Sequence, residues 1–383
     1  MRAPRLSTKA LAAAVVAMML TATGCSGAAP SQPDAVGPRV QGTSISTGAP
    51  VLSSGDAWDE LGAEGTDAGV RTYVIEREPG EDVVAAVNVP VPAGTAKDGF
   101  ELQLEDTAGN RCDSGRATLY SVMSAALLSA QVASTAGSDT CLEAQRLVLT
   151  LRRSDGGSET LTARLRLTKV AGVEKKDWPT TEAEAPTVNV GESSVGTPGA
   201  WLSDAGNLTS GRTVSGEIGS GGTQTYGIPV QWGQGLVVKL VLPRPSPSVE
   251  QQLAETKVTA GITLVGPTGA ASSFQQVFRS SGTGGADLTL DPVQYAQDRW
   301  AGQYTVVVTM ATDKETTAVI PYQLIAQTYG NVDPALGPNV PMEVVATSTT
   351  PLPEPVLWTM LVVGVLLIIA GMAQVTMHRQ LPN

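Results

Sequence analysis

The chain has 383 residues, of which 25 are lysine or arginine and 36 are aspartate or glutamate, giving a formal net charge of −11. An acidic surface repels phosphate backbones, so this balance argues against nucleic acid as a partner. The one histidine, His378, lies near the C-terminus. The chain before it therefore has no imidazole for a Ser-His-Asp triad, a Cys-His pair or a His-ligated zinc site.

The N-terminal residues have the pattern of an export signal. Arg2, Arg5 and Lys9 precede an apolar run of about 13 residues, which is too short for a bilayer span of about 20 residues. We therefore expect a signal peptide over 1–28 and an extracytoplasmic location for the residues that follow. The sequence ATGC, which ends at Cys25, resembles a bacterial lipobox, so Cys25 is either lipidated or removed by cleavage at the small residues after it.

The other end of the chain has the pattern of a membrane anchor. Val356 to Ala373 is uncharged and just long enough to span a bilayer, and Arg379 follows it. We expect a Pro-rich stalk over 333–355, a transmembrane helix over 356–376 and a cytoplasmic tail over 377–383. The protein is thus expected in the cell membrane, crossing it once, with most of the chain outside. A buried helix of the soluble portion is the alternative interpretation of the apolar run.

Two further segments rich in Pro, Gly, Ser and Thr lack an apolar period and are interpreted as linkers, at 29–46 and 175–199. The stretches between the linkers, 47–174 and 200–332, each have the common size of one domain.

The two predicted domains share a sequence pattern. TYVIEREPGEDVVAAVNVP begins at Thr72, TYGIPVQWGQGLVVKLVLP begins at Thr225, and the two align without a gap. Apolar residues alternate in both, as expected of strands with one buried face. Gly80 and Gly233 stand between the two strands of each copy, where a tight turn tolerates a positive φ. Each copy therefore contains a β-hairpin.

Four more pairs of segments match in the same order along the chain: LSSG with LTSG, LQLEDTAGN with ITLVGPTGA, QRLVLTL with QYTVVVT, and ARLRL with YQLIA. We predict an all-β chain with two tandem antiparallel β-sandwich domains, jelly-roll-like, of six to eight strands each. The Ala-rich segment 116–134 is compatible with a helix or with strands.

The segments TYGIPVQWGQGLVVKLVLP, ITLVGPTGA and GQYTVVVT resemble the bacterial pre-peptidase C-terminal (PPC) type of β-sandwich. The second copy fits this pattern well, whereas Gln145 and Arg146 replace the late Gly-x-Tyr element in the first. The layout also resembles actinobacterial surface proteins that carry such sandwiches before a C-terminal anchor. The resemblance implies a non-catalytic appendage.

Three residues outside the strand pattern are candidates for special roles. Cys112 and Cys141 both lie in the exported part, where oxidising conditions favour a disulfide. Closing that loop would stabilise the first domain by roughly 3 kcal/mol in the chain-entropy model. Trp232 lies at a hairpin turn, where we expect it to be exposed; it either contacts a partner or packs against a neighbouring strand or domain.

These patterns predict a non-catalytic, membrane-anchored protein of the cell surface that binds another envelope protein or a cell-wall polymer. No cofactor or metal site is expected, and the irregular spacing of Asp287, Asp291 and Asp298 does not suit calcium. One alternative is a subunit of a membrane complex that acts through its transmembrane helix. Another is a hydrolase of unrecognised type, since 36 acidic residues could supply a catalytic carboxylate pair.

Overall fold

The computed structural model of the chain describes residues 37–78, 81–91, 97–119, 126–134, 139–171, 184–280, 286–289, 301–314 and 316–332. No helix within these ranges is long and apolar enough to span a bilayer. The expected signal peptide, Cys25, the stalk over 333–355, the anchor over 356–376 and the tail lie outside the described residues and stay predictions.

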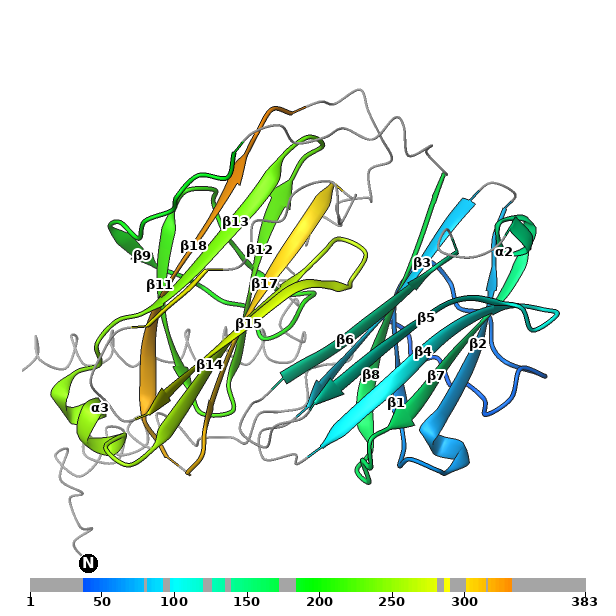
Figure 1. The fold of residues 1–383 in the computed structure, drawn as a ribbon, viewed down its shortest axis with the longest axis horizontal. Coiled ribbons are helices and arrows are strands. Elements are labelled where there is room, and N and C mark those ends of the chain that lie inside the picture. Colours follow the sequence, from blue (N-terminus) through cyan, green and yellow to red (C-terminus); the bar gives the residue numbers. More distant parts are fainter. Residues whose placement is uncertain are drawn as a thin grey trace, which may run out of the picture. The chain divides into compact units, whose positions relative to one another are not determined.

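The first sandwich is drawn in blue to green in Figure 1. Its eight strands are β1 (Gly55–Leu61), β2 (Val70–Glu76), β3 (Glu81–Val91), β4 (Asp98–Asp106), β5 (Arg111–Leu119), β6 (Ala126–Ala133), β7 (Arg146–Ser154) and β8 (Leu161–Ala171). They form two antiparallel sheets, in the orders β1-β8-β3-β6 and β2-β7-β4-β5. Strand one pairs with eight, two with seven, three with six and four with five, which is the jelly-roll order.

Alternation along each strand builds the core of this sandwich. On β4, Phe100, Leu102 and Leu104 are buried, whereas Glu101 is exposed and Gln103 is half-buried. The other strands contribute apolar residues to the same core in the same way. Each sheet therefore has one apolar face toward the core and one outward face.

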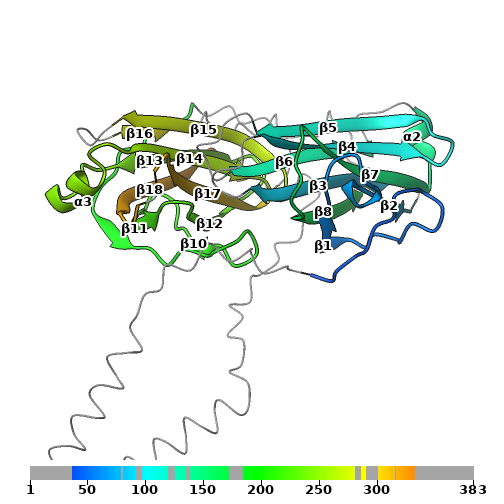
Figure 2. The same ribbon diagram turned by 90° about the horizontal axis from the view of Figure 1, so that it is seen from below.

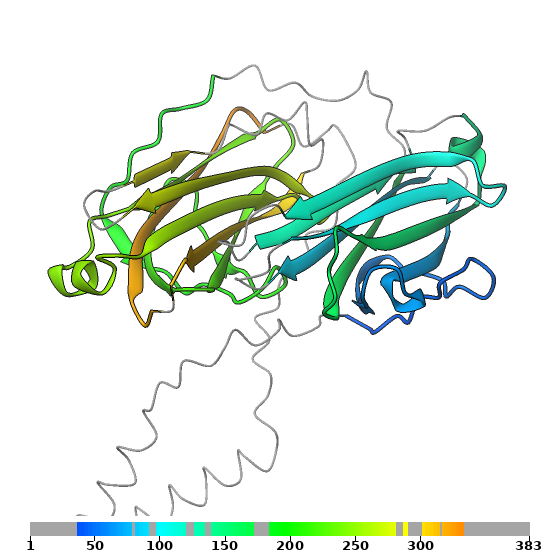
Figure 3. The ribbon, with the colours of Figure 1, turned by 60° about the horizontal axis from the view of Figure 1, so that its bottom comes forward.

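The second sandwich repeats this order, and its strands can be followed in Figures 2 and 3. The corresponding strands are β11 (Thr213–Gly219), β12 (Thr223–Val230), β13 (Gly235–Leu242), β14 (Lys257–Val265), β15 (Ala271–Ser280), β16 (Ala286–Thr289), β17 (Gly302–Thr312) and β18 (Val319–Tyr329). One sheet runs β16-β13-β18-β11 and the other β12-β17-β14-β15, each extended at one edge by a short strand, β9 (Ser193–Val195) or β10 (Gly206–Asn207). The prediction of two tandem jelly-roll sandwiches is confirmed.

A segment before the first strand of each sandwich joins its two sheets. In the first copy, Arg39 bridges to Trp58 on β1, and Thr43 then bridges to Thr72 on β2. In the second copy, β9 pairs with β11 in the same parallel sense, and Gly199 bridges to Thr225 on β12. Thr72 and Thr225 are the residues that the sequence alignment equates, so the duplication extends to this segment.

Both linkers expected from composition therefore end earlier than predicted. Residues 39–43 belong to the first sandwich, although 29–46 was interpreted as linker. Residues 188–199 belong to the second, because Val188 packs on Val237 and Ile325 on the outer face of β13 and β18. A Pro- and Gly-rich composition does not distinguish a free linker from a chain that pairs with a sheet edge.

Turn glycines match between the copies as well. Gly109 and Gly269 are the third residues of the equivalent TAGN and PTGA segments, and their φ angles are +87° and +89°. Gly233 has φ +80°, as predicted for the second hairpin, whereas Gly80 lies outside the described residues. The segment 116–134 contains the end of β5 and all of β6, so its strand interpretation holds where the chain is described.

Candidate binding surface

The buried carboxylates of the first sandwich are saturated by hydrogen bonds. Asp98 pairs with Arg153 at 2.5 Å, with side chains only 2% and 1% exposed, and Arg153 also donates to the carbonyl of Glu159. Asp106 accepts from the backbone of Ala108 and from Asn110, and these bonds hold the pKa of its carboxyl below the usual value. Such carboxylates maintain turns and strand ends.

A tyrosine network joins the two sheets of the first sandwich. The hydroxyl of Tyr73 donates to Asp59 at 2.8 Å, and Asp59 also accepts from the backbone N–H of Gly42 and pairs with Arg71. Burial, and then the charge of Asp59, raises the pKa of Tyr73 far above its usual range. A Cβ on Gly42 would lie 2.9 Å from the Tyr73 ring, so glycine is needed there.

The second sandwich has a corresponding tyrosine network that is built from different residues. The hydroxyl of Tyr226, the counterpart of Tyr73, lies 2.6 Å from that of Tyr322, which donates to Gln224, the counterpart of Arg71. Gly216 stands where the first copy has Asp59, and a Cβ there would lie 2.4 Å from the Tyr322 hydroxyl. The glycine makes room for the second tyrosine.

Burial raises the pKa of Tyr322 and of Tyr226. In the first network the charge of Asp59 is paired with that of Arg71, and the second network consists of uncharged groups joined by hydrogen bonds. We therefore assign them to stability and not to catalysis.

The two cysteines for which the sequence predicted a disulfide are bonded in the structure. Cys112 and Cys141 form the expected disulfide, which ties β5 to the short helix α2 (Asp139–Glu143). Arg77 holds the same helix by donating to the carbonyls of Cys141, Leu142 and Ala144. This anchoring of α2 by a buried arginine has no signature in the sequence.

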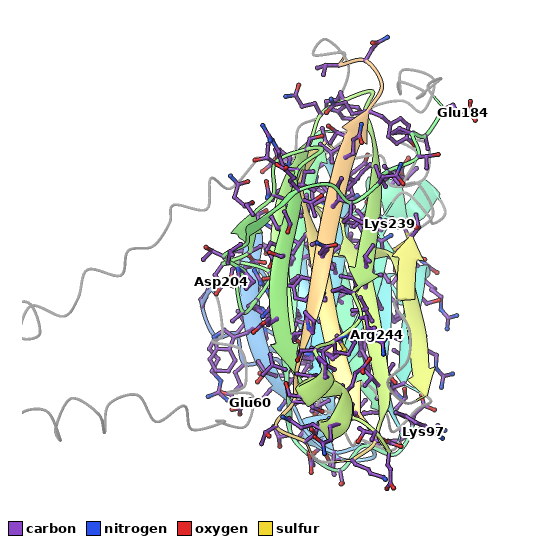
Figure 4. The ribbon with its side chains drawn as sticks, turned by 90° about the vertical axis from the view of Figure 1, so that its left-hand side faces the viewer. Glu60, Lys97, Glu184, Asp204, Lys239 and Arg244 are labelled. Atoms are coloured by element: carbon purple, nitrogen blue, oxygen red, sulfur yellow. A yellow bond between two sulfur atoms is a disulfide. The ribbon has the colours of Figure 1, made fainter. Side chains whose placement is uncertain are left out.

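Trp232 is buried, so the expected exposure is wrong and the packing alternative holds. Its side chain is 3% exposed and packs against Ala301, just before β17. The indole thus lies against the sandwich at the hairpin end, and we do not propose it as a partner contact. The turn Asp204, visible in Figure 4, accepts from the backbone N–H groups of Ala200 and Trp201, so it also serves the fold.

One sheet face of the first sandwich is open and polar. The outward residues of the β2-β7-β4-β5 sheet form cross-strand rows, because residues directly opposite share a face. Glu101 stands between Arg152 on β7 and Arg116 on β5, and Glu105 stands between Val148 and Arg111. Gln103 lies between these rows, opposite Thr150 and Ser114.

The charged members of this face are solvated. Glu101 and Arg116 have side chains 51% and 53% exposed, with 3.6 Å between their nearest charged atoms. Arg116 also reaches Asp155 at 2.9 Å, and this bond, with that of the surface residue Lys97 (Figure 4), holds the pKa of Asp155 well below its usual range. The apolar part of the face is confined to the β2 side, where Val51 is half exposed.

The two central strands of the equivalent face in the second sandwich are closed. Most outward residues of β14 and β17 are small or β-branched and almost wholly buried, whereas Gln303 is half-buried and Lys257 is exposed; the buried ones are Thr259, Thr263, Val265, Thr305, Val307, Thr309 and Ala311. Among the described residues of these two strands, Lys257 is the one charged position. The two copies therefore share a fold and differ in the exposure of this face.

The described residues contain no group of three or more His, Cys, Asp or Glu side chains that could hold a metal ion. What the open face offers is guanidinium, carboxylate, amide and hydroxyl groups on a flat sheet. Groups of this kind bind by hydrogen bonds and ion pairs.

No protein-family model matches the sequence, and no curated protein does, so the resemblance to PPC-type sandwiches stays a prediction. Among solved structures, the chain resembles the tandem CBM22-1–CBM22-2 domain of Paenibacillus barcinonensis Xyn10C at 12% identity and a TM-score of 0.19, covering 72% of this chain and 93% of that one. It also resembles the M60 catalytic domain with two CBM51 domains of Clostridium perfringens ZmpB at 10% identity and a TM-score of 0.21, covering 70% of this chain and 36% of that one. TM-scores this low carry no argument about function.

Proposed function

We propose that this protein is a non-catalytic, membrane-anchored binding protein of the cell surface, whose jelly-roll domains meet another envelope protein or a cell-wall polymer. The observation that carries the proposal is the contrast between the two copies. One sheet face is open, flat and polar in the first sandwich, whereas most outward residues of the two central strands of its counterpart, β14 and β17, are buried. A duplicated module that keeps one such face exposed is suited to binding.

The state of the acidic side chains supports the absence of catalysis. Catalytic carboxylates need a free oxygen at a concave site and a pKa tuned to proton transfer. Asp59, Asp98 and Asp106 are instead engaged by backbone N–H groups and arginine. The charged residues of the open face stand on a sheet and not in a cleft.

The surface location rests on sequence patterns at both ends of the chain. A signal peptide over 1–28 would export the sandwiches, and an apolar helix over 356–376 would hold them at the membrane. The Pro-rich stalk over 333–355 would set the sandwiches away from the bilayer.

Binding to the envelope tests the proposal directly. The full-length protein in detergent is mixed with insoluble cell wall of the source bacterium and sedimented, and in parallel it is cross-linked in intact cells. We expect saturable sedimentation with the wall or one stoichiometric cross-linked protein. If neither occurs, or if the wall releases soluble products in a protein-dependent way, the proposal is wrong.

A further inference from the structure

The open face of the β2-β7-β4-β5 sheet has a charge balance unlike that of the whole chain. Four arginines and three glutamates point outward from its strands: Arg111, Arg116, Arg146, Arg152, Glu76, Glu101 and Glu105. The chain as a whole has 36 acidic and 25 basic residues. This face is therefore locally cationic on an acidic protein.

Two of these arginines, Arg111 and Arg152, make no ion pair with the glutamate that lies opposite each of them. Arg116 pairs with Glu101 and Asp155, and Arg146 lies 3.7 Å from Glu76. Arg111 and Arg152 are exposed, and within the described part of the chain neither side chain makes a hydrogen bond or an ion pair. Guanidinium groups that are exposed and unpaired are ready to bind carboxylate or phosphate groups in a bidentate manner.

The two unpaired arginines are far apart on a flat surface. They stand on strands that flank β4, four residues apart in register, so strand geometry separates them by roughly 17 Å. One small ion cannot contact both. An extended ligand that carries several negative groups can.

The side chains at the centre of the open face indicate which class of polymer it can bind. Between the arginines lie Gln103, whose amide N–H donates to Glu105, and Thr150 and Ser114, two hydroxyls that can both donate and accept. Protein interfaces are usually organised around buried aromatic or other apolar anchors, and no aromatic side chain points outward from the described residues of this sheet. Hydroxyl-rich sugar residues fit this centre better than a polypeptide does.

We propose that this face binds an anionic polysaccharide, in which carboxylate groups meet Arg111 and Arg152 and sugar hydroxyls meet the row through Gln103. This inference rests on the proposed binding function and names its face and ligand class. The negative net charge of the chain does not prevent such binding, because charges beyond a Debye length of about 8 Å are screened at physiological salt.

The test uses the full-length protein in detergent and three soluble probes of matched length: polygalacturonate, poly-glutamate and neutral dextran. The variant is Arg111→Gln with Arg152→Gln, and the control is Arg212→Gln, an exposed arginine of the second sandwich that has no ion pair in the described residues. All substituted side chains are exposed, so the thermal melting curves should coincide. Titration calorimetry measures the affinities.

We expect polygalacturonate to bind best and to bind more weakly as salt rises. Its affinity should fall at least about tenfold in the double variant, because both bidentate, charged contacts are lost. The control should change the affinity less than about twofold. Equal binding of dextran, equal or tighter binding of poly-glutamate, no binding at all, or an undiminished affinity in the double variant would each overturn the proposal.

Sedimentation with native wall separates this inference from the broader one. If the wild-type protein and the double variant sediment equally, the protein binds the wall through another surface and only this inference is wrong. If the wild-type protein neither sediments nor cross-links, the proposed function itself is wrong.

Discussion

Replacing Gly216 by alanine would place a Cβ 2.4 Å from the hydroxyl oxygen and 2.5 Å from the Cζ of Tyr322; Gly216 is half-buried and Tyr322 lies in the core of the second sandwich. The ring of Tyr322 is held by hydrogen bonds to Tyr226 and Gln224, so it cannot move aside without losing them. The structure therefore predicts a strong energetic coupling between positions 216 and 322.

The magnitudes follow from the packing. Gly216→Ala should cost about 1–3 kcal/mol, as overpacking of a core usually does. Tyr322→Ala removes an aromatic side chain that is 1% exposed and should cost about 3–5 kcal/mol. In the Tyr322→Ala background the clash is gone, and Gly216→Ala should be neutral or stabilising by about 0.5–1 kcal/mol, because alanine loses less backbone entropy than glycine.

Hydrogen exchange of peptides that cover β12 and β18 in the full-length protein gives the free energy of unfolding of the second sandwich for the four members of this cycle. We expect a coupling of about 1–4 kcal/mol, with the double variant more stable than the sum of the single costs implies. Costs that add to within about 0.5 kcal/mol would refute the interpretation that Gly216 exists to admit Tyr322.

Three further variants test other parts of the structure. Arg116 holds the pKa of Asp155 below its usual range, so ionised Asp155 stabilises the fold at pH values above its unfolded-state pKa of about 4. This stabilisation is lost as the pH falls and the carboxylate is protonated. Asp155→Asn should therefore cost about 1 kcal/mol of unfolding free energy at pH 7, and an equal cost at pH 2 would contradict this. Cys112→Ser with Cys141→Ser should lower the stability of the first sandwich by roughly 3 kcal/mol and leave exchange in the second unchanged; an effect on both would show that the bridge acts beyond its own sandwich. Val188→Asp should destabilise the second sandwich by roughly 3 kcal/mol in urea unfolding, whereas a neutral effect would mean that 188 is a free linker residue.

The fold was predictable because a duplication doubles every signal. A period-two pattern at one position is weak, but Tyr73 and Tyr226 stand at the head of the same pattern in both copies. The order of the strands within each sheet could not be predicted from the spacing of apolar residues, because strand pairing in a jelly roll joins segments that are distant in the chain. The disulfide was predictable because Cys112 and Cys141 are the two cysteines left in the part of the chain expected outside the cell.

The contents of the site were not predictable in the same way. The exchange of Asp59 for Gly216, with Tyr322 facing it, is visible only once the first strand of each copy is aligned through its partner strand. Trp232 was placed outside by its hairpin turn and lies inside because of a contact with Ala301, far along the chain. Whether a sheet face is open depends on what packs over it, which local alternation does not encode.

The most direct test of the binding face is hydrogen exchange of the full-length protein with and without polygalacturonate. We expect slower exchange in peptides from β4 and β5, residues 98–119, and no change in the equivalent peptides of the second sandwich, residues 257–280. Protection confined to the second sandwich, or protection equal in both, would contradict it.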